Sequence, residues 1–209
     1  MLIEHLNHRL RELEAQALRR HRRSAESPCA PHLRVSAAGV DAPARDVLAF
    51  CSNDYLGLAN HPELIDALAE GARRFGAGSG ASHLISGHSR AHALLEDELA
   101  QWMVPCIPAA RALGFCTGYM ANLALLTALG DASATIFADK LNHASLVDGA
   151  LLAKAPLQRY AHGRLDMLAS QLGRCSTPVK LIVSDAVFSM DGDLADLPAL
   201  LALAEAHDA

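Results

Sequence analysis

Residues 135–160 read TIFADKLNHASLVDGALLAKAPLQRY, and this stretch decides the fold class. A short apolar run at 135–138 leads into a polar loop, a helical apolar pattern over 146–154 and a second apolar run at 157–160. Parallel strands need a connection of about a dozen residues or more, which is usually a helix. Two strands that are joined by a helix are therefore expected to be parallel. The stretch therefore predicts a unit of strand, helix and parallel strand.

The same alternation continues on both sides of this unit. It is typical of an α/β fold with a mainly parallel sheet flanked by helices on both faces. Apolar runs predict two further strands, at 110–116 and 179–187. Apolar periodicity, with Pro and Gly at the helix ends, predicts helices at 62–75, 89–103, 119–129, 166–172 and 196–207.

The N-terminal part has a different pattern. Leucines at helical spacing from Leu2 predict an amphipathic helix that ends in a basic cluster at 19–23, either a solvated helix end or a source of an anion-binding arginine. Residues 24–43 predict an irregular connection with at most a short strand near 33–35, and a strand follows at 47–51.

We therefore divide the chain into an N-terminal helix and connecting arm, residues 1–45, and an incomplete larger domain, residues 46–209. An open α/β sheet normally continues with another strand after a crossover helix. Because the predicted helix at 196–207 is the last element, we expect the sequence to be a fragment of a longer domain.

Composition excludes several classes of protein. The 209 residues are 51% hydrophobic and carry a net charge of −5, which disfavours nucleic acid and anionic membrane surfaces as partners. The five cysteines are scattered without a Cys-x-x-Cys pair, so they predict neither disulfides nor a zinc site. No apolar run is typical of a signal peptide or a membrane span. We expect a soluble, cytoplasmic protein.

Four loops carry candidate binding residues. The glycine-rich segment 75–87, FGAGSGASHLISG, matches neither a dinucleotide fingerprint nor a P-loop, which leaves a simple turn or a ligand-lining loop. Gly118 and Tyr119 open a helix, where free N–H groups either cap the helix or bind phosphate. His143 and Ser189 follow predicted strands, at the edge where α/β folds bind ligands. His88 and His92 have no third partner at suitable spacing, so no metal is predicted.

Taken together, the motifs resemble those of the α-oxoamine synthases, a family of pyridoxal-phosphate enzymes. The matching motifs, in chain order, are CSNDYLGL at 51–58, GSG at 78–80 with SG at 86–87, NHAS at 142–145 and VFSMDGD at 187–193. The resemblance implies the aspartate-aminotransferase-like fold, fold type I of pyridoxal-phosphate enzymes. It covers nearly all 209 residues but only about the first half of a family member.

The resemblance also implies an activity. Members of this family condense an amino acid with an acyl thioester and release carbon dioxide. They act as homodimers with active sites at the subunit interface. The motifs are most similar to the branch that supplies biotin synthesis from L-alanine and pimeloyl-CoA or pimeloyl-acyl carrier protein. A sister enzyme that uses glycine or serine is an alternative, as is a non-catalytic paralogue that acts as a dimer partner.

Roles for individual residues follow from the resemblance. His143 would stack on the cofactor ring and is the candidate catalytic residue. The implied cofactor-binding residues are Gly118, Tyr119, His143, Asp185 and Ser189, and the implied substrate-binding residues are Arg19, Asn53 and His143.

This sequence departs from the family pattern in two respects. His83 stands where many members carry arginine. The family's Schiff-base lysine, together with the aspartate and histidine that accompany it, corresponds to positions after Ala209. We interpret the three lysines present, Lys140, Lys154 and Lys180, as surface residues, and we expect the 209-residue chain to be inactive on its own.

Overall fold

The computed structural model describes residues 1–37 and 43–209, which form two compact units. The first unit is Met1–Ala93 and the second is Leu94–Ala209. Helix α3 (Arg90–Met103) crosses the boundary between them. The division into residues 1–45 and 46–209 that the sequence suggests stays a prediction.

The second unit contains a three-stranded parallel sheet. Strand β4 (Ala134–Asp139) lies between β5 (Leu157–Tyr160) and β6 (Val179–Val183), and Ile136 is in register with Leu157 and Leu181. The predicted parallel pairing of the strands around residues 135–138 and 157–160 is confirmed.

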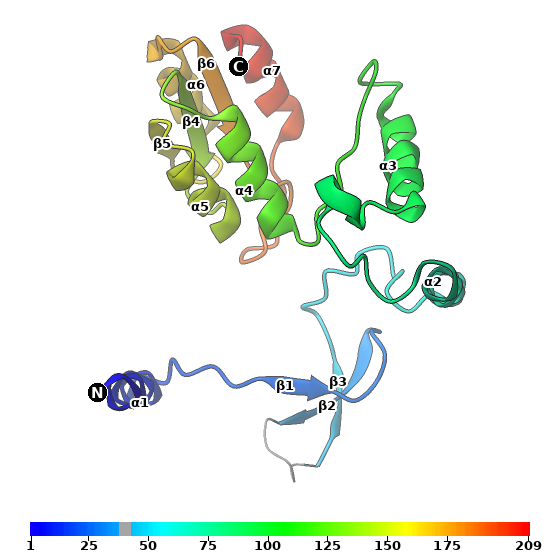
Figure 1. Cartoon of the computed structure of the whole chain (residues 1–209). Coiled ribbons are helices and arrows are strands. Elements are labelled where there is room, and N and C mark those ends of the chain that lie inside the picture. Colours follow the sequence, from blue (N-terminus) through cyan, green and yellow to red (C-terminus); the bar gives the residue numbers. More distant parts are fainter. Residues whose placement is uncertain (38–42) are drawn as a thin grey trace. The chain divides into compact units, whose positions relative to one another are not determined.

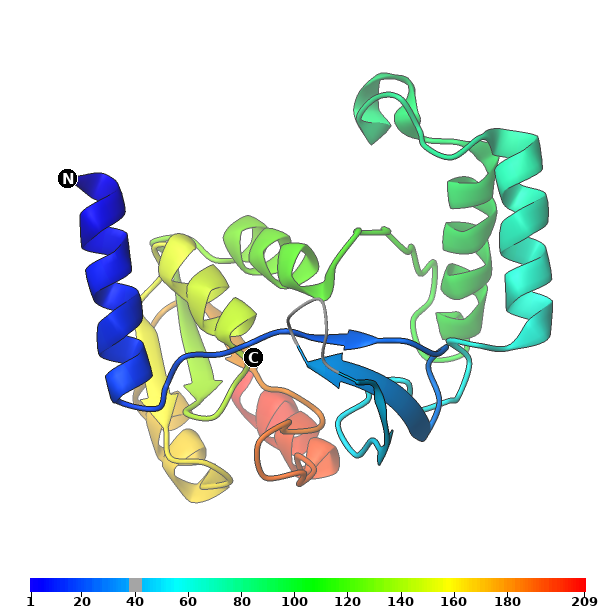
Figure 2. The ribbon, with the colours of Figure 1, turned by 90° about the horizontal axis from the view of Figure 1, so that it is seen from below.

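Helices cover both faces of this sheet (Figures 1 and 2). One face carries α4 (Gly118–Leu129) and α5 (Ala144–Leu152), and the other carries α6 (Leu165–Arg174) and α7 (Leu197–His207). All six residues of β4 are buried, because both of its faces are covered. The apolar run that predicted this strand has its physical origin in that double burial.

Each face of the sheet has its own hydrophobic core. Ile136 packs with Leu126 of α4 and Ala150 of α5. The next residue, Phe137, points to the opposite face and packs with Leu168 of α6 and Leu200 of α7. Successive side chains of a strand point to opposite faces, so two adjacent apolar residues serve two separate cores.

A glycine permits close packing of α4 on α5. A Cβ atom at Gly149 would lie 3.0 Å from Leu126 Cδ1 and 3.1 Å from the carbonyl oxygen of Asn122. Only a residue without a side chain fits this approach without displacing its neighbours. The contact fixes α5, and with it the loop that carries His143.

The first unit contains a different sheet. Strands β1 (Arg23–Ala25), β2 (His32–Ala37) and β3 (Arg45–Leu48) pair in antiparallel order β1-β2-β3, as Figures 1 and 2 show in blue. The unit also holds α1 (Leu2–Ala15), α2 (Pro62–Phe75) and the π-helical turn η1 (His83–Gly87).

The sequence only partly predicted this antiparallel sheet. The short strand expected near 33–35 lies within β2, and the strand expected at 47–51 is observed at Arg45–Leu48. Strand β1 was not predicted and lies in the segment taken as irregular. All three residues of β1 are exposed, so their sequence carries no apolar alternation that would reveal a strand.

The strand predicted at 110–116 is wrong. Residues 111–115 have no regular secondary structure, and within residues 43–209 no strand pairs with them. A strand is stable only when a neighbour accepts and donates its backbone hydrogen bonds. An apolar run alone therefore does not produce one here.

The helices of the described ranges are all too short or too polar to cross a membrane.

Candidate functional site

At the N-terminus of α4, two backbone N–H groups have no acceptor among the described residues. The Thr117 hydroxyl accepts the N–H of Met120 at 3.2 Å, and the Thr117 carbonyl accepts the N–H of Ala121 at 3.1 Å. The N–H groups of Gly118 and Tyr119 precede the helical ladder and have no acceptor within it. The position that a Cβ of Gly118 would take has no atom within 4 Å. The positive end of the helix dipole lies at these donors, and a helix N-terminus of this kind favours an anion.

His143 occupies the corresponding position on α5. Its Nδ1 accepts the N–H of Ser145 at 3.2 Å and lies 2.7 Å from the Ser145 hydroxyl. Asn122 of α4 donates to that same hydroxyl at 2.9 Å. Because Nδ1 acts as an acceptor, the neutral ring carries its proton on Nε2. The exposed imidazole is thus held at Nδ1, while no described residue forms a hydrogen bond with Nε2.

A second contact joins the first turn of α4 to the middle of α5. The Tyr119 hydroxyl donates to the carboxylate of Asp148, and this hydrogen bond is the main reason that the pKa of Tyr119 is raised above its usual range. The Tyr119 side chain is therefore directed toward α5, while its backbone N–H stays at the start of α4. Together with the hydrogen bond from Asn122 to Ser145, this contact fixes the N-terminal half of α4 against α5.

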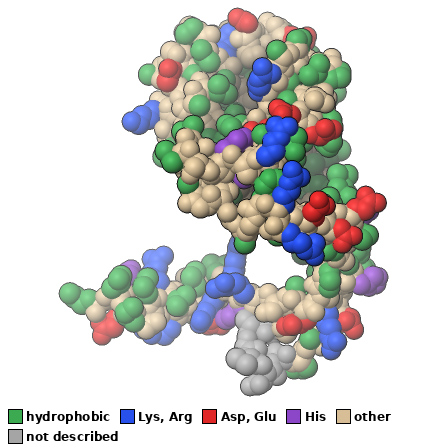
Figure 3. Space-filling model, turned by 45° about the vertical axis from the view of Figure 1, so that its right-hand side comes forward, with side chains coloured by type: hydrophobic (Ala, Val, Ile, Leu, Met, Phe, Trp, Pro, Cys, Tyr) green, Lys and Arg blue, Asp and Glu red, His purple; other side chains and the backbone are tan. Residues whose placement is uncertain are grey.

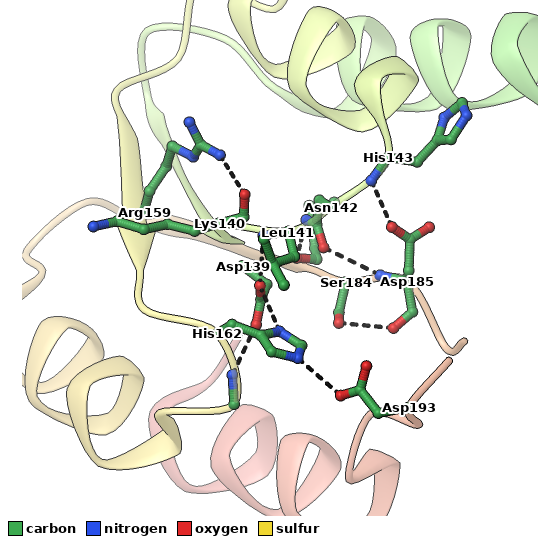
Figure 4. A network of polar contacts seen from close by, with 12 residues as sticks. Asp139, Lys140, Leu141, Asn142, His143, Arg159, His162, Ser184, Asp185 and Asp193 are labelled. Carbon is green, nitrogen blue, oxygen red and sulfur yellow. Dashed lines mark hydrogen bonds and ion pairs between the residues drawn. The ribbon is translucent and has the colours of Figure 1, made fainter. Parts of the chain in front are cut away.

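Asp185, which follows β6, supports the loop that carries His143. Its carboxylate accepts the backbone N–H of His143 at 2.5 Å. Asn142 donates to the carbonyl of Val183 at 2.9 Å and accepts the N–H of Asp185 at 3.2 Å (Figure 4). The polar ends of β4 and β6 are thus joined at one edge of the sheet, and Figure 4 shows the imidazole of His143 turned away from Asp185.

Ser189 lies in a short hairpin that follows β6. Val187 bridges Leu194, the N–H of Phe188 donates to the Asp193 carbonyl at 2.9 Å, and the N–H of Gly192 donates to the Phe188 carbonyl at 2.8 Å. Gly192 has a φ of 74°, which favours glycine at this turn. Ser189 is exposed, and in the described part of the chain no hydrogen bond joins it to His143 or Asp185.

The sequence did not identify a second polar cluster at the same edge. His162, which follows β5, lies 3.0 Å through Nδ1 from Asp139 and 2.8 Å through Nε2 from Asp193 (Figure 4). The hydrogen bonds to Asp193 and then to Asp139 raise the pKa of His162. The rule that drew attention to His143, a polar residue directly after a parallel strand, would also have found Asp139 and His162.

A cavity of about 190 Å³ lies beside this cluster. Its lining includes Asp139, Tyr160, His162 and Phe188. Burial, followed by the charge of Asp139, raises the pKa of Tyr160 to about 12. Tyr160 is therefore neutral at physiological pH and acts here as a packing residue with a polar tip.

Two predicted substrate-binding residues belong to the first unit. Arg19 follows α1 and forms an ion pair with Glu14 at 3.1 Å. Asn53 is exposed in a loop where the next residue, Asp54, accepts the N–H groups of Leu58 and Ala59. Their assignment to a substrate stays a prediction.

The three lysines do not lie among the predicted cofactor-binding residues. Lys180 stands near the amino end of β6 and donates to the carbonyl of His207 at 2.7 Å. Lys154 directly follows the C-cap of α5, and Lys140 is exposed after β4, where its carbonyl accepts Arg159 at 2.7 Å. Across the described residues, no group of three or more His, Cys, Asp or Glu side chains is arranged to hold a metal ion.

This fold and this edge of the sheet define a class of protein. The chain belongs to the aminotransferase class I and II family, whose model matches residues 45–209. The predicted aspartate-aminotransferase-like fold is confirmed by that match and by similarity to solved structures. A serine palmitoyltransferase structure from Sphingomonas wittichii is 28% identical to this chain and superposes with a TM-score of 0.81. The match covers 97% of this chain and 49% of the serine palmitoyltransferase chain.

Two highly similar relatives in sequence are 8-amino-7-oxononanoate synthases. Over 209 residues the chain is 77% identical to 8-amino-7-oxononanoate synthase 2 of Polaromonas sp. strain JS666, which covers 100% of this chain. Over 210 residues it is 76% identical to 8-amino-7-oxononanoate synthase of Leptothrix cholodnii, again over 100% of this chain. The chain spans about half the length of these curated relatives, 51% and 52%.

A solved structure agrees with this grouping. The structure of 8-amino-7-oxononanoate synthase from Francisella tularensis is 32% identical to this chain, with a TM-score of 0.60. The match covers 74% of this chain and 41% of the Francisella chain. The resemblance to the α-oxoamine synthases that the motifs indicated is confirmed.

Proposed function

We propose that the protein catalyses the pyridoxal-phosphate-dependent condensation of L-alanine with a pimeloyl thioester, which releases carbon dioxide and forms 8-amino-7-oxononanoate for biotin synthesis. The observation that carries the proposal is the hydrogen-bonded pair of helices α4 and α5, in which Gly118 begins α4 and the exposed ring of His143 precedes α5. The 77% identity to an 8-amino-7-oxononanoate synthase supports the choice of substrates.

The donor set fits pyridoxal phosphate. The N–H groups of Gly118 and Tyr119 would bind the phosphate, because helix N-termini favour anions. The His143 imidazole is a flat ring suited to stacking on a pyridine, and the exposed hydroxyl of Ser189 can donate to the ring oxygen. Bound pyridoxal phosphate supplies an electron sink for the carbanion that forms when the amino acid loses a group.

Asp185 has an indirect role in this proposal. Its carboxylate accepts the backbone N–H of His143 and does not reach the ring. Its hydrogen bonds with His143 and Asn142 hold the loop that carries His143 against the end of β6. We therefore propose that Asp185 contributes to cofactor binding indirectly, by positioning His143.

His143 is held so that its open nitrogen is available for chemistry. Hydrogen bonds at Nδ1 from Ser145 leave Nε2 free to hold or transfer a proton near the substrate. Arg19 would bind the substrate carboxylate, and Asn53 would contact the substrate, as the family resemblance implies. The protein would act as a homodimer in the cytoplasm, where its five free cysteines stay reduced.

None of Lys140, Lys154 and Lys180 is proposed as the lysine that bonds the cofactor. Lys180, for example, donates to the last turn of α7 near the end of β6 opposite the site. Borohydride reduction of the 209-residue chain with pyridoxal phosphate, followed by peptide mass spectrometry, should show no stoichiometric label on these lysines. Specific labelling of any one of them, together with product from alanine and pimeloyl-CoA, would overturn this assignment.

The activity is tested on the product of the complete reading frame. With pimeloyl-CoA or pimeloyl-acyl carrier protein as the acyl donor, we expect L-alanine to be consumed at least about tenfold faster than glycine or L-serine, a difference of about 1.4 kcal/mol in transition-state binding. The His143→Ala variant should lose most of this activity, while the control His207→Asn on α7 should keep it. Preferential use of serine would instead favour a sister enzyme, which the similarity to serine palmitoyltransferase structures allows.

A further inference from the structure

Three segments from different parts of the second unit meet at His162. Asp139 ends β4, His162 follows β5, and Asp193 lies in the hairpin 187–194 that follows β6. Both ring nitrogens of His162 approach a carboxylate oxygen, Nδ1 at 3.0 Å and Nε2 at 2.8 Å. The imidazole therefore bridges the sheet edge and the hairpin.

Asp139 fixes the sheet side of this bridge. The residue is only 2% exposed, and both of its carboxylate oxygens are used. One oxygen accepts the N–H of Leu141 at 2.8 Å, and the other accepts the N–H of Gly163 at 3.1 Å. Because these backbone bonds fix the carboxylate, the imidazole that bonds to it has one defined orientation.

Phe188 and Asp193 connect the imidazole to the hairpin. The buried ring of Phe188, 3% exposed, meets His162 edge to face, with ring centres 4.4 Å apart and an interplanar angle of 75°. The backbone of Phe188 closes the hairpin by exchanging hydrogen bonds with Asp193 and Gly192. Ser189 is the next residue in the chain, so the position of its hydroxyl depends on where Phe188 is held.

We propose that His162 is a positioning residue for Ser189, holding the hairpin 187–194 against the carboxyl ends of β4 and β5 through Asp193 and Phe188. The proposal rests on the proposed function, in which Ser189 binds the cofactor ring. His162 itself acts only through the hairpin and has no assigned contact with the cofactor or substrate.

The attachment of the hairpin 187–194 by His162, called the anchor below, is tested first without cofactor, by amide hydrogen exchange. Replacing His162 by Asn keeps a donor near Asp139 but shortens the side chain, so that it no longer reaches Asp193. We expect the amides of Phe188, Gly192 and Ala195 to exchange about tenfold faster, as for the loss of a hydrogen bond to a charged group, while the amides of β4 are unchanged. The control His207→Asn should change neither set.

Cofactor binding provides the second readout, on the product of the complete reading frame. We expect H162N and Ser189→Ala to weaken pyridoxal phosphate binding by similar factors and to shift its absorbance band in the same direction. The double variant should bind no more weakly than Ser189→Ala alone, because both changes remove one interaction. If the two losses instead multiply, His162 acts independently of Ser189 and the proposal fails.

The remaining outcomes are also decisive. Equal loosening of β4 and the hairpin in H162N would assign His162 a general structural role and overturn the proposal. If H162N does not fold, Asp193→Ala replaces it, because Asp193 has a side chain that is 45% exposed and its removal leaves the Asp139–His162 pair intact. Unchanged hairpin exchange in that variant would overturn the anchor. If Ser189→Ala has no effect on cofactor binding, the role of Ser189 in the proposed function fails, whereas the exchange result stands by itself.

Discussion

The two compact units differ in how they are stabilised. In the second unit, β4 is buried along its whole length between two cores. Among the described residues of the first unit, only Gly87 is buried, and apolar side chains such as Leu68 (75% exposed) and Leu84 (96% exposed) face outward. Figure 3 shows hydrophobic side chains distributed over the visible surface. The second unit therefore has its own buried cores, whereas the described residues of the first unit leave their apolar side chains largely exposed.

The largest expected effect comes from breaking a core of the second unit. Phe137→Ala should lower the free energy of unfolding by about 3–5 kcal/mol, because Phe137 is fully buried between α6 and α7. The matched change in the first unit, Leu68→Ala, should alter it by no more than about 0.5 kcal/mol. Urea unfolding followed by circular dichroism measures both values. Equal losses would contradict the contrast between the units.

Two helical glycines, one in each unit, differ in how closely their neighbours approach. Gly149 on α5 is crowded by Leu126 and Asn122, so Gly149→Ala should destabilise the protein by about 1–3 kcal/mol through overpacking. Gly71 on α2 has no atom within 4 Å of its Cβ position, so Gly71→Ala should stabilise its helix by about 0.5–1 kcal/mol. Hydrogen exchange in α2 and α5 measures each effect locally. A stabilising Gly149→Ala would show that α4 and α5 pack less closely than described.

Helix caps distinguish the units more weakly. Thr117 caps α4 with its hydroxyl, so Thr117→Ala should cost about 1 kcal/mol. His61 at the corresponding position of α2 makes no side-chain cap, and His61→Ser should therefore stabilise α2 by a similar amount. Amide exchange in the first turn of each helix reports both changes. A cost at Thr117 well below 0.5 kcal/mol would mean that water replaces the cap.

The smallest expected effect is a pH dependence confined to the hairpin 187–194. The carboxylates of Asp193 and Asp139 raise the folded pKa of His162 above its usual value near 6.5, while Tyr160 from β5 stays neutral in this range and Asp196 from α7 lines the same cavity. A raised folded pKa means that the stabilisation is complete below the unfolded pKa and is lost as pH rises through the folded pKa.

NMR titration of His162 together with amide exchange of Phe188 and Gly192 tests this pH dependence. We expect the hairpin to loosen as pH rises above about 6.5 and to keep its low-pH protection below it. The variant H162N should remove the dependence. If the hairpin instead loosened as the pH fell, a group other than His162 would control the pH dependence.

How far the sequence predicted the molecule differs between the two units. In the second unit, double burial of β4 produces an apolar run, and the helices around it produce periodic patterns, so strands and helices near residues 119–207 were found to within a few residues. In the first unit, Val47 and Leu48 give a signal for β3, whereas β1 is exposed and has no apolar alternation, so its pairing depends on a partner that the local sequence does not reveal.

The candidate site shows the same limit. The positions of Gly118 and His143 at helix starts follow from local signals, and the structure joins those helices. The cluster of Asp139, His162 and Asp193 depends on three segments that meet only in the folded chain. Periodicity does not contain that information, although the placement of Asp139 and His162 after parallel strands was available in the sequence.

The proposed function requires the N-termini of α4 and α5 to bind the phosphate and ring of pyridoxal phosphate. NMR titration of the protein with pyridoxal phosphate tests this requirement, with pyridoxal, which lacks the phosphate, as the matched control. We expect saturable shifts of the Gly118 and Tyr119 amides and of the His143 ring with pyridoxal phosphate, and much weaker amide shifts with pyridoxal. Saturable binding that leaves Gly118 and Tyr119 unchanged, or equal shifts with both compounds, would contradict the account.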